Sequence, residues 1–372
     1  MKQTNTNTRI PRNPASNALS LGKSIPETIL RLSGPAILEQ FLICLASLVD
    51  TAMVGSIGAA ATASVAINIS TVWLINGCIT ALSVGFSFLV SHSVGEGNPE
   101  KTESVVRQSI SASIVLGAVL MTAVLSLHRI LPNLLGAAPE VLPNAQIYLG
   151  IIGLGLVPQA LGVVLSAVLR SAGNTKIPMA ANMSANCLNV LGNFLLIYPS
   201  RQISLPGLPI GFQTISVWGA GLGIQGAAIS TALSQYALAF LMLYHIYHSP
   251  TAAKICIRGN YQFRKWTLRS LFRISVPVLL ERCTLCLGQI SLTAIISGLG
   301  TIPLAAHYLT NQTEGLLYLP AYGFAYTATT LIGQSLGSGN KTLASRFSKD
   351  ICIISTIVII IACIPVFLLS RP

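Results

Sequence analysis

Four of the ten acidic residues in this 372-residue chain fall inside long apolar stretches, where little water can solvate a carboxylate. They are Glu39, Asp50, Glu281 and Glu314. An ionised carboxylate at the centre of a bilayer costs about 2.5–3.5 kcal/mol on insertion scales, so a bound proton or cation is favoured there. Carboxyl groups in this setting suit the transport of H⁺ or Na⁺.

Glu39 and Asp50 belong to the same apolar stretch and lie 11 residues apart. That spacing makes about three turns of an α-helix, which places both carboxyl groups on one face, roughly 16 Å apart along the axis. We interpret both as candidate ion-coupling groups. The alternative for each is a position near the membrane surface, where the carboxylate is simply solvated.

A second polar stripe follows further along the chain, made of Asn182, Asn186, Asn189 and Asn193. Their spacing of four, three and four residues puts all four amides on one helix face. Such amides either join helices, at about 0.6–2 kcal/mol per hydrogen bond, or line a wet cavity. The length of the stripe favours the cavity.

The composition excludes an ordinary soluble domain. Apolar residues make up 52% of the chain, charged residues 9%, and the mean hydropathy is +0.70, whereas soluble domains carry about 25% charged residues. A transmembrane helix needs about 20 apolar residues. Nine stretches reach that length and predict an all-α polytopic membrane protein; they cover approximately residues 32–54, 64–92, 108–127, 146–169, 178–198, 222–247, 274–297, 304–333 and 351–370.

The net charge of +12 could indicate nucleic-acid binding, but its distribution favours a membrane protein. With a cytoplasmic N-terminus, 18 of the 22 Lys and Arg residues fall on the cytoplasmic side of the nine stretches. The other side holds Arg129, Arg201 and Arg371, and Arg282 lies within a stretch. The positive-inside rule then predicts a multi-pass protein of the cell (inner) membrane with an external C-terminus.

The basic stretch 254–273 lies on the predicted cytoplasmic side and faces anionic lipid headgroups. A plain topology signal is the favoured interpretation, and specific lipid binding is the alternative. Membrane lipids are therefore expected partners, and nucleic acid is not.

Residues 31–98 repeat at 273–340 with a constant offset of 242. A duplicated unit of apolar helices is typical of secondary transporters, whose two halves surround a site near the middle of the membrane. The paired identities include Arg31/Arg273, Ser33/Ser275, Pro35/Pro277, Leu38/Leu280, Glu39/Glu281, Thr51/Thr293, Gly58/Gly300, Gly95/Gly337, Gly97/Gly339 and Asn98/Asn340.

One motif would indicate a cofactor in another setting. The sequence "GLGIQG" at 221–226 fits the dinucleotide-binding fingerprint, but that fingerprint needs a preceding strand within a βαβ unit. Here it opens an apolar helix, so we interpret its glycines as sites of close helix packing. The chain is predicted to hold no cofactor and to be no enzyme.

Several motifs together resemble the multidrug and toxic compound extrusion (MATE) family over nearly all of residues 31–370. The second half resembles the prokaryotic DNA-damage-inducible (DinF-like) branch. The motifs are "LSGPAILEQFLICLASLVDTAMVGSIG" (32–58), "VLRSAGNTKIPM" (168–179), "NFLLIY" (193–198), "GIQGAAISTALSQ" (223–235) and the paired "GEGN" and "GSGN" loops.

The resemblance implies an antiporter with two six-helix lobes in a V shape, which exports amphipathic or cationic, drug-like organic compounds in exchange for H⁺ or Na⁺. By motif position, Asp50 corresponds to the ion-linked acid of the first helix, and Asn189 and Asn193 to the polar or acidic pair of the fifth. A Na⁺ site at these three residues is expected. Where some members carry Asp, this chain has Asn193, which weakens the case for a relay with two carboxylates.

The expected substrate cavity adds polar residues of both halves: Asn182, Asn186, Thr231, Glu281 and Glu314. The expected domain order is a cytoplasmic polar tail (1–30), a six-helix lobe (31–250), a basic cytoplasmic loop (251–272) and a partial C-terminal lobe of three helices (273–372).

About nine of the twelve helices expected from the resemblance are present, which predicts a truncated second lobe and a complementing C-terminal fragment as a partner. Two alternatives stay open. One is a non-transporting remnant or membrane scaffold. The other is a lipid-linked precursor flippase of the same superfamily, which would need a strongly cationic cavity, whereas Arg282 is the one cation within the predicted segments.

The charge distribution generates a topology prediction. In a cysteine-free background, Ser56→Cys and Leu205→Cys should react with an impermeant thiol reagent added to intact cells, because both positions are expected outside. Labelling that occurs only after permeabilisation would reverse the orientation.

Overall fold

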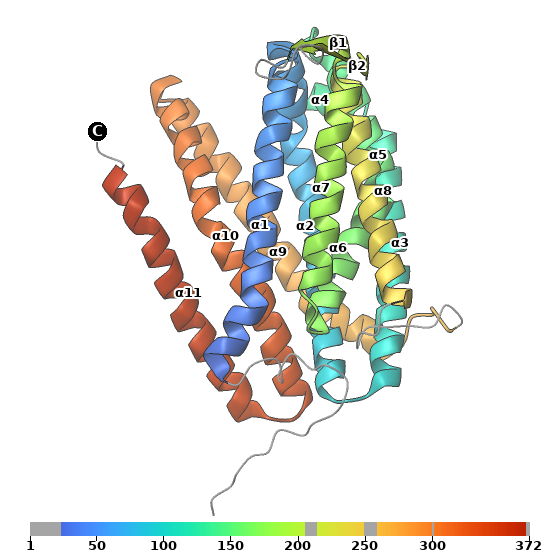
Figure 1. The fold of residues 1–372 in the computed structure, drawn as a ribbon, viewed down its shortest axis with the longest axis vertical. Helices are drawn as coiled ribbons and strands as arrows, with labels where there is room; N and C mark the ends of the chain where they lie inside the picture. The colour runs from blue at the N-terminus through green and yellow to red at the C-terminus, as the bar shows by residue number, and fades with distance from the viewer. Residues whose placement is uncertain (1–23, 205–213, 249–258, 300, 370–372) are drawn as a thin grey trace, which may run out of the picture.

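A computed structural model describes residues 24–204, 214–248, 259–299 and 301–369. Long helices run between two ends of the molecule, and α9, α10 and α11 spread away from the others (Figure 1). We call the end that carries β1, β2 and α4 the hairpin end. The opposite end, where α2 meets α3 and α10 meets α11, is the basic end.

Each predicted apolar stretch corresponds to a long helix, the fourth being formed by α5 and α6 together. The elements in chain order are α1 Ile25–Gly55, α2 Ala59–Gly95, α3 Pro99–Leu127, α4 Leu131–Leu134, α5 Leu142–Leu154, α6 Leu156–Ser171, α7 Lys176–Leu196, β1 Pro199–Ser204, β2 Thr214–Ala220, α8 Ile224–His248, α9 Lys265–Ser297, α10 Thr301–Gly337 and α11 Lys341–Leu369.

Apolar length alone does not fix the number of membrane crossings. Among the described residues, five helices are long and apolar enough to cross a bilayer, namely α1, α2, α3, α8 and α11. The pair α5–α6, bent by 51°, makes up to six. Helices α7, α9 and α10 are not among the helices that meet this test in the described residues, so nine crossings stay a prediction.

The duplicated sequence folds into a duplicated structure. Helices α10 and α11 begin and end 242 positions after α2 and α3, and α9 ends 242 positions after α1. Each copy also repeats one turn: Gly97 and Gly339 adopt φ angles of 68° and 77°. Asn98 and Asn340 then cap the next helix, each accepting a backbone N–H at 2.9 Å. The left-handed φ explains why the repeat keeps glycine there.

Two predicted boundaries are wrong in detail. Helix α1 begins at Ile25, inside the predicted tail, because Ser24 accepts the Glu27 N–H and Pro26 occupies the first turn, where a missing donor does no harm. Helix α9 begins at Lys265, so the last part of the predicted basic loop is helical. Apolar runs mark the part of a helix inside the bilayer, and these helices extend beyond it.

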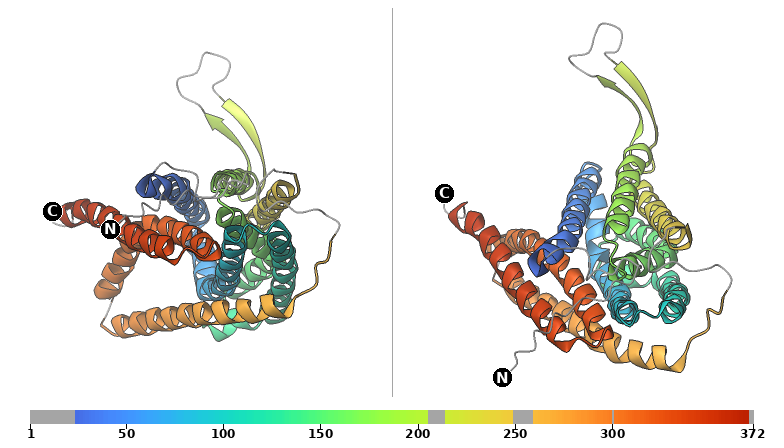
Figure 2. Two further views of the ribbon diagram at one scale, coloured as in Figure 1. Left: turned by 90° about the horizontal axis from the view of Figure 1, so that it is seen from below. Right: turned by 60° about the horizontal axis from the view of Figure 1, so that its bottom comes forward.

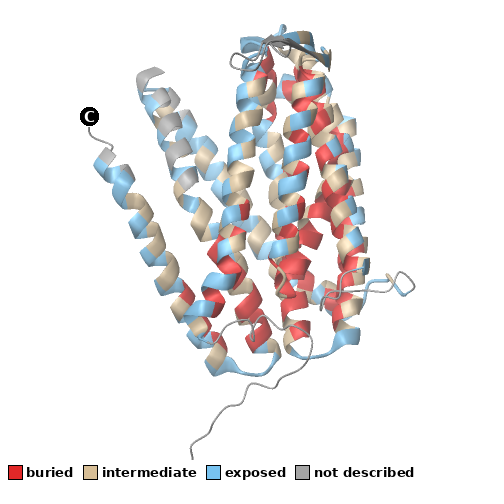
Figure 3. Cartoon of the chain, viewed as in Figure 1, coloured by how far each residue is buried: buried red, intermediate tan, exposed pale blue. Residues whose placement is uncertain are grey.

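Helix α6 lies at the centre of the first half. The largest hydrophobic cluster joins it to α2, α3 and α8 through side chains such as Phe86, Leu165, Leu169 and Met242, all 0% exposed. Burial gathers around α6 and at the basic ends of α1 and α10 (Figure 3). The two halves therefore share their buried contacts mainly at the basic end.

The hairpin of β1 and β2 was not predicted. Its strands pair antiparallel, with Ile203 opposite Ile215, and it projects beyond the helices (Figure 2). The connecting residues 205–213 lie outside the described residues, as do 1–23 of the predicted tail, 249–258 of the predicted basic region, Gly300 and 370–372. Position 205 of the labelling experiment is among them.

Candidate functional site

The first polar group, the Asp50 cluster, consists of Asp50, Asn189, Asn193 and Thr231. Asn193 Nδ2 donates to Asp50 Oδ1 and also lies 3.4 Å from Asn189 Oδ1. Asn189 Nδ2 donates to Thr231 Oγ1 over 3.2 Å. A chain of side-chain hydrogen bonds thus runs from α1 through α7 to α8.

Close packing of α7 against α8 positions these amides. Ser230 Oγ donates to the Asn189 carbonyl at 2.7 Å. A Cβ on Gly192 would overlap Ser230, and a Cβ on Gly226 would press on the Leu196 carbonyl. The interpretation of "GLGIQG" as a packing motif is confirmed at Gly226.

The Asp50 cluster is only partly shielded. Asn193 is fully buried and Asn189 is 9% exposed, while Asp50 is half-buried. Among the described residues, no Lys or Arg forms an ion pair with Asp50, and Asn193 Oδ1 has no hydrogen-bond partner. The carboxyl group therefore has a neutral neighbour that offers both a donor and a free acceptor.

The second polar group, the Glu39 cluster, consists of Glu39, Arg170, Asn182 and Tyr326. Arg170 Nη1 and Asn182 Nδ2 both donate to Glu39 Oε1, at 2.7 and 2.8 Å. The two charged side chains are 2% and 7% exposed. The Tyr326 ring of α10 lies under the guanidinium, 4.4 Å from Arg170 Cζ to the ring centroid.

The two acids of α1 thus have different surroundings, although they share a helix face as predicted from their spacing. Glu39 is neutralised by a buried cation, whereas Asp50 is held by an uncharged amide. The Glu39 carboxylate already has a bound cation, the Arg170 guanidinium. Of the two, Asp50 is the better candidate for binding a transported ion.

The asparagine stripe joins helices at three of its four positions. Asn182 donates to Glu39, Asn189 to Thr231 and Asn193 to Asp50, and Asn186 is half-buried between them. The stripe therefore connects α7 to both α1 and α8. Whether it also lines the substrate path stays a prediction.

The structure does not bring the two acids of the second half to the Asp50 cluster. Glu281 on α9 is exposed, and Glu314 on α10 is exposed and accepts the Tyr318 hydroxyl at 2.8 Å. Asp50 accepts a hydrogen bond from Asn193, and in the described structure neither of these acids is its partner. In the described part of the chain, no group of three His, Cys, Asp or Glu side chains could hold a metal ion.

The burial of Arg170 was not predicted from the sequence. It ends an apolar stretch and was counted among the cytoplasmic charges, but it is buried between the two halves of the chain. The partner Glu39 lies 131 positions away, so spacing along one helix could not reveal the pair. The sequence signal that could have indicated this pair was an Arg directly after a long apolar run, together with an acid inside another apolar run.

The repeat and the Asp50 cluster together indicate the class of protein. A repeated three-helix unit with a half-buried carboxyl group in its bundle is typical of polytopic membrane transporters. The chain belongs to the MatE family, which it matches over residues 35–195 and 277–372.

Relatives of the same family support this assignment. The chain is 27% identical over 359 residues to "Probable multidrug resistance protein NorM" of Thermotoga maritima, covering 94% of this chain and 71% of that protein. It is 24% identical to the uncharacterized transporter YisQ of Bacillus subtilis, spanning 64% of its length. It is also 24% identical to human "Multidrug and toxin extrusion protein 1", covering 90% of this chain and 55% of the human protein.

Solved structures share the fold. A MOP superfamily transporter from Pyrococcus furiosus superposes with a TM-score of 0.82 at 21% identity, covering 94% of this chain and 73% of the other. A multidrug resistance MATE family transporter, described as outward-facing, gives 0.79 at 21% identity over 90% of this chain and 70% of the other.

The Glu39 cluster generates a stability prediction. Arg170→Met should lower the free energy of unfolding by about 3–5 kcal/mol, because it leaves Glu39 buried without a counter-charge. Thermal unfolding in detergent measures the change. The control is Lys101→Met, which removes the partly exposed pair with Glu96 and should cost at most about 1 kcal/mol. Equal effects of the two variants would contradict the central role of the buried pair.

Proposed function

We propose that this protein is a secondary active antiporter that exports amphipathic or cationic organic compounds in exchange for H⁺ or Na⁺. The observation that carries the proposal is Asp50, a half-buried carboxyl group held by an amide and paired with no described cation. The names of the relatives, multidrug resistance and toxin extrusion, support the substrate class. The chain spans 55–71% of the three relatives described above, so the whole activity is part of the proposal.

The proposed orientation puts the basic end in the cytoplasm and the hairpin end outside the cell (inner) membrane. The turns at the basic end precede α3 and α11, whose first turns carry Lys101 and Lys341. Basic residues remain on the cytoplasmic side during insertion, which supports this orientation.

Proton coupling follows from the chemistry of the Asp50–Asn193 contact. In the ionised state the carboxylate accepts the Asn193 N–H. Protonation turns one carboxyl oxygen into a donor, and Asn193 Oδ1, which lacks a partner in the described structure, is an acceptor on the same side chain. The same pair of residues can thus satisfy both protonation states, which a mobile proton requires.

Sodium coupling would use the same residues differently. The ion would take oxygen ligands from Asp50, Asn189 and Asn193, with Thr231 Oγ1 within the same hydrogen-bonded chain. Carboxylate, carbonyl and hydroxyl oxygens are suitable ligands for a hard cation. One negative charge with neutral oxygens suits a monovalent ion.

The proposed route for an amphipathic substrate is the face of α1 that meets α10. Near the basic end this face touches α10 at Ile37, where a Cβ on Gly323 would overlap it. Further along, at helical spacing, the same face exposes Phe41, Leu45 and Leu48 by 53%, 49% and 53%. At 100° per residue these side chains lie on the side of α1 opposite to Asp50. An exposed apolar wall suits the apolar part of an amphipathic compound.

The first functional test removes the titratable group. Asp50→Asn should reduce ethidium efflux from intact cells to background at unchanged membrane abundance, because the amide cannot release a proton or bind Na⁺ as an anion. Asp350→Asn on α11, the one other aspartate in the chain, is the matched control and should keep efflux. Full efflux by Asp50→Asn would reject the ion-coupling role, and an inactive wild type would favour the non-transporting scaffold.

The second test separates the two roles of the asparagine stripe. Asn189→Ala and Asn193→Ala should change efflux rates or substrate preference while the melting temperature in detergent falls only slightly, since interhelical amide bonds contribute about 0.6–2 kcal/mol. Asn182→Ala, which leaves Arg170 as the partner of Glu39, is the comparison. A large drop in melting temperature with unchanged substrate preference would make the stripe a purely structural contact.

A further inference from the structure

Helices α2 and α10 cross at the basic end through residues that the repeat makes equivalent. A Cβ on Gly95 would overlap the main chain of Gln334, and a Cβ on Gly337 would overlap the His92 carbonyl. Gly337 repeats Gly95 and Gln334 repeats His92, both at the offset of 242. Each half therefore presents the same glycine to the same position of the other half.

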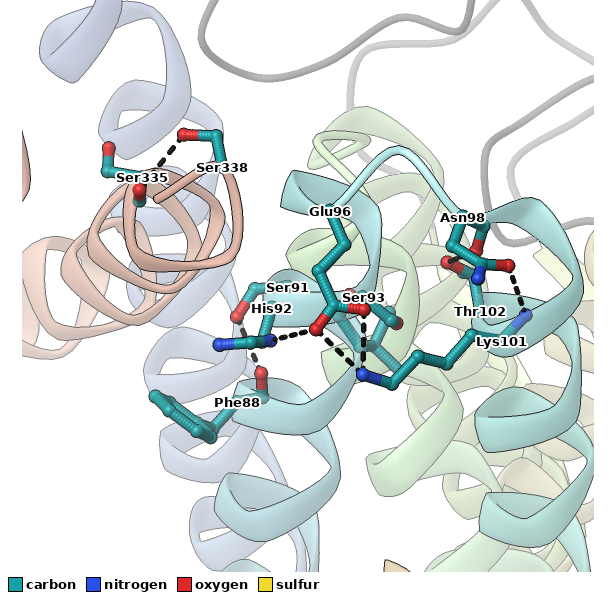
Figure 4. A network of polar contacts seen from close by, with 11 residues as sticks. Phe88, Ser91, His92, Ser93, Glu96, Asn98, Lys101, Thr102, Ser335 and Ser338 are labelled. Carbon is teal, nitrogen blue, oxygen red and sulfur yellow. Dashed lines mark hydrogen bonds and ion pairs between the residues drawn. The ribbon is translucent and has the colours of Figure 1, made fainter. Parts of the chain in front are cut away.

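The serine side chains around this crossing bond within their own helix or the turn that follows it. Figure 4 shows Ser335 on α10 and Ser338 just after that helix, near Ser91 and His92 on α2. Ser338 donates to the Ser335 carbonyl at 2.9 Å, and Ser91 to the Phe88 carbonyl at 3.0 Å. The crossing itself is thus a contact of backbone against backbone. An added side-chain atom at either glycine would disturb it. In the described structure, no side-chain hydrogen bond between α2 and α10 has to break there when the two helices separate.

A row of α10 side chains continues the contact onto α6. Thr330 Oγ1 lies 3.3 Å from the Arg170 carbonyl, and Gln334 Nε2 donates to the Ser171 carbonyl at 2.8 Å. Carbonyls of the last helical turn lack partners within their own helix. With Tyr326 under the Arg170 guanidinium, α10 therefore caps and covers the end of a helix from the other half.

Helices α1 and α10 pack together at the basic end and spread apart toward the hairpin end (Figure 1). At the basic end of the bundle, Ile29 and Leu32 of α1 form a buried cluster with Phe324 and Leu331 of α10. Toward the hairpin end, Gly315 of α10 has no atom within 4 Å of a built Cβ, and α1 exposes the apolar face described above. The described halves are therefore closed at the basic end and separated at the other.

We propose that the α2–α10 crossing, together with Arg170 and the α10 row of Tyr326, Thr330 and Gln334, is the closure that seals the basic end of the transport path. Arg170 acts as a positioning residue, because its guanidinium binds Glu39 within one half and stacks on Tyr326 of the other. This inference rests on the proposed function, since an antiporter must open this end to exchange its ligands.

The equivalence of the two glycines makes a sharp test possible. Gly95→Ala and Gly337→Ala should each force the basic ends apart, in the same direction, because each adds a Cβ at one of two symmetric positions. Gly34→Ala and Gly288→Ala are matched controls: both are glycines within helices with no atom within 4 Å of a built Cβ. As interior positions they gain at least as much helix propensity as the helix-terminal Gly95 and Gly337, without added contact.

Distances between spin labels measure the closure directly. In a cysteine-free chain, labels at the equivalent exposed positions Glu100 and Thr342 report the basic end, and labels at Ile57 and Leu299 report the hairpin end. The ratio of separated to closed basic ends should rise on the order of five-fold or more in each crossing variant, as expected from the smallest cost of overpacking. The controls should keep the parent distances.

A second pair of variants tests Arg170 without touching the crossing. Tyr326→Leu should raise the separated fraction, because it removes the aromatic face under the guanidinium, whereas Tyr326→Phe should keep the parent distances. Unchanged distances in both Gly95→Ala and Tyr326→Leu would overturn the proposal. The readout needs neither ion nor substrate, so this failure is distinct from retained efflux in Asp50→Asn, which bears on the antiport proposal alone.

Discussion

A charge buried among helices has to be neutralised where it lies, and the Glu39–Arg170 pair meets that constraint for the first half. The pair fixes the rotation of α1, because Glu39 can reach Arg170 and Asn182 from one helix face only. Asp50 shares that face, so the same rotation presents it to Asn193. The geometry of the ion-binding candidate thus depends on a salt bridge about three helical turns away.

Most of the architecture could be predicted because it follows from two strong signals, the length of the apolar stretches and a sequence repeat with a constant offset. The offset of 242 fixed which helices are equivalent, down to the capped turns at Asn98 and Asn340. Helix periodicity placed Glu39 with Asp50 and the four asparagines on single faces. These are local properties of one helix, and the spacing of residues along the sequence determines them directly.

The contacts between helices were beyond that reasoning. Nothing in the spacing of residues pairs Glu39 with Arg170 or Asn182, and an Arg at the end of an apolar run looks like a topology signal. The hairpin of β1 and β2 was missed for a related reason: its two short strands lie between apolar helices and depend on each other for their hydrogen bonds. Helix boundaries shifted because caps such as Ser24 act outside the apolar run.

The crossing of α2 and α10 has a consequence for how such a chain can arise. It is an isologous contact: Gly95 of the first half meets Gln334 of the second, and the equivalent Gly337 of the second half meets His92 of the first. Two separate copies of a single half could form the same contact as a homodimer with a two-fold axis along the membrane normal. Gene fusion would then preserve a ready-made interface, and Tyr326, which stands where the first half has Val84, makes the two sides unequal.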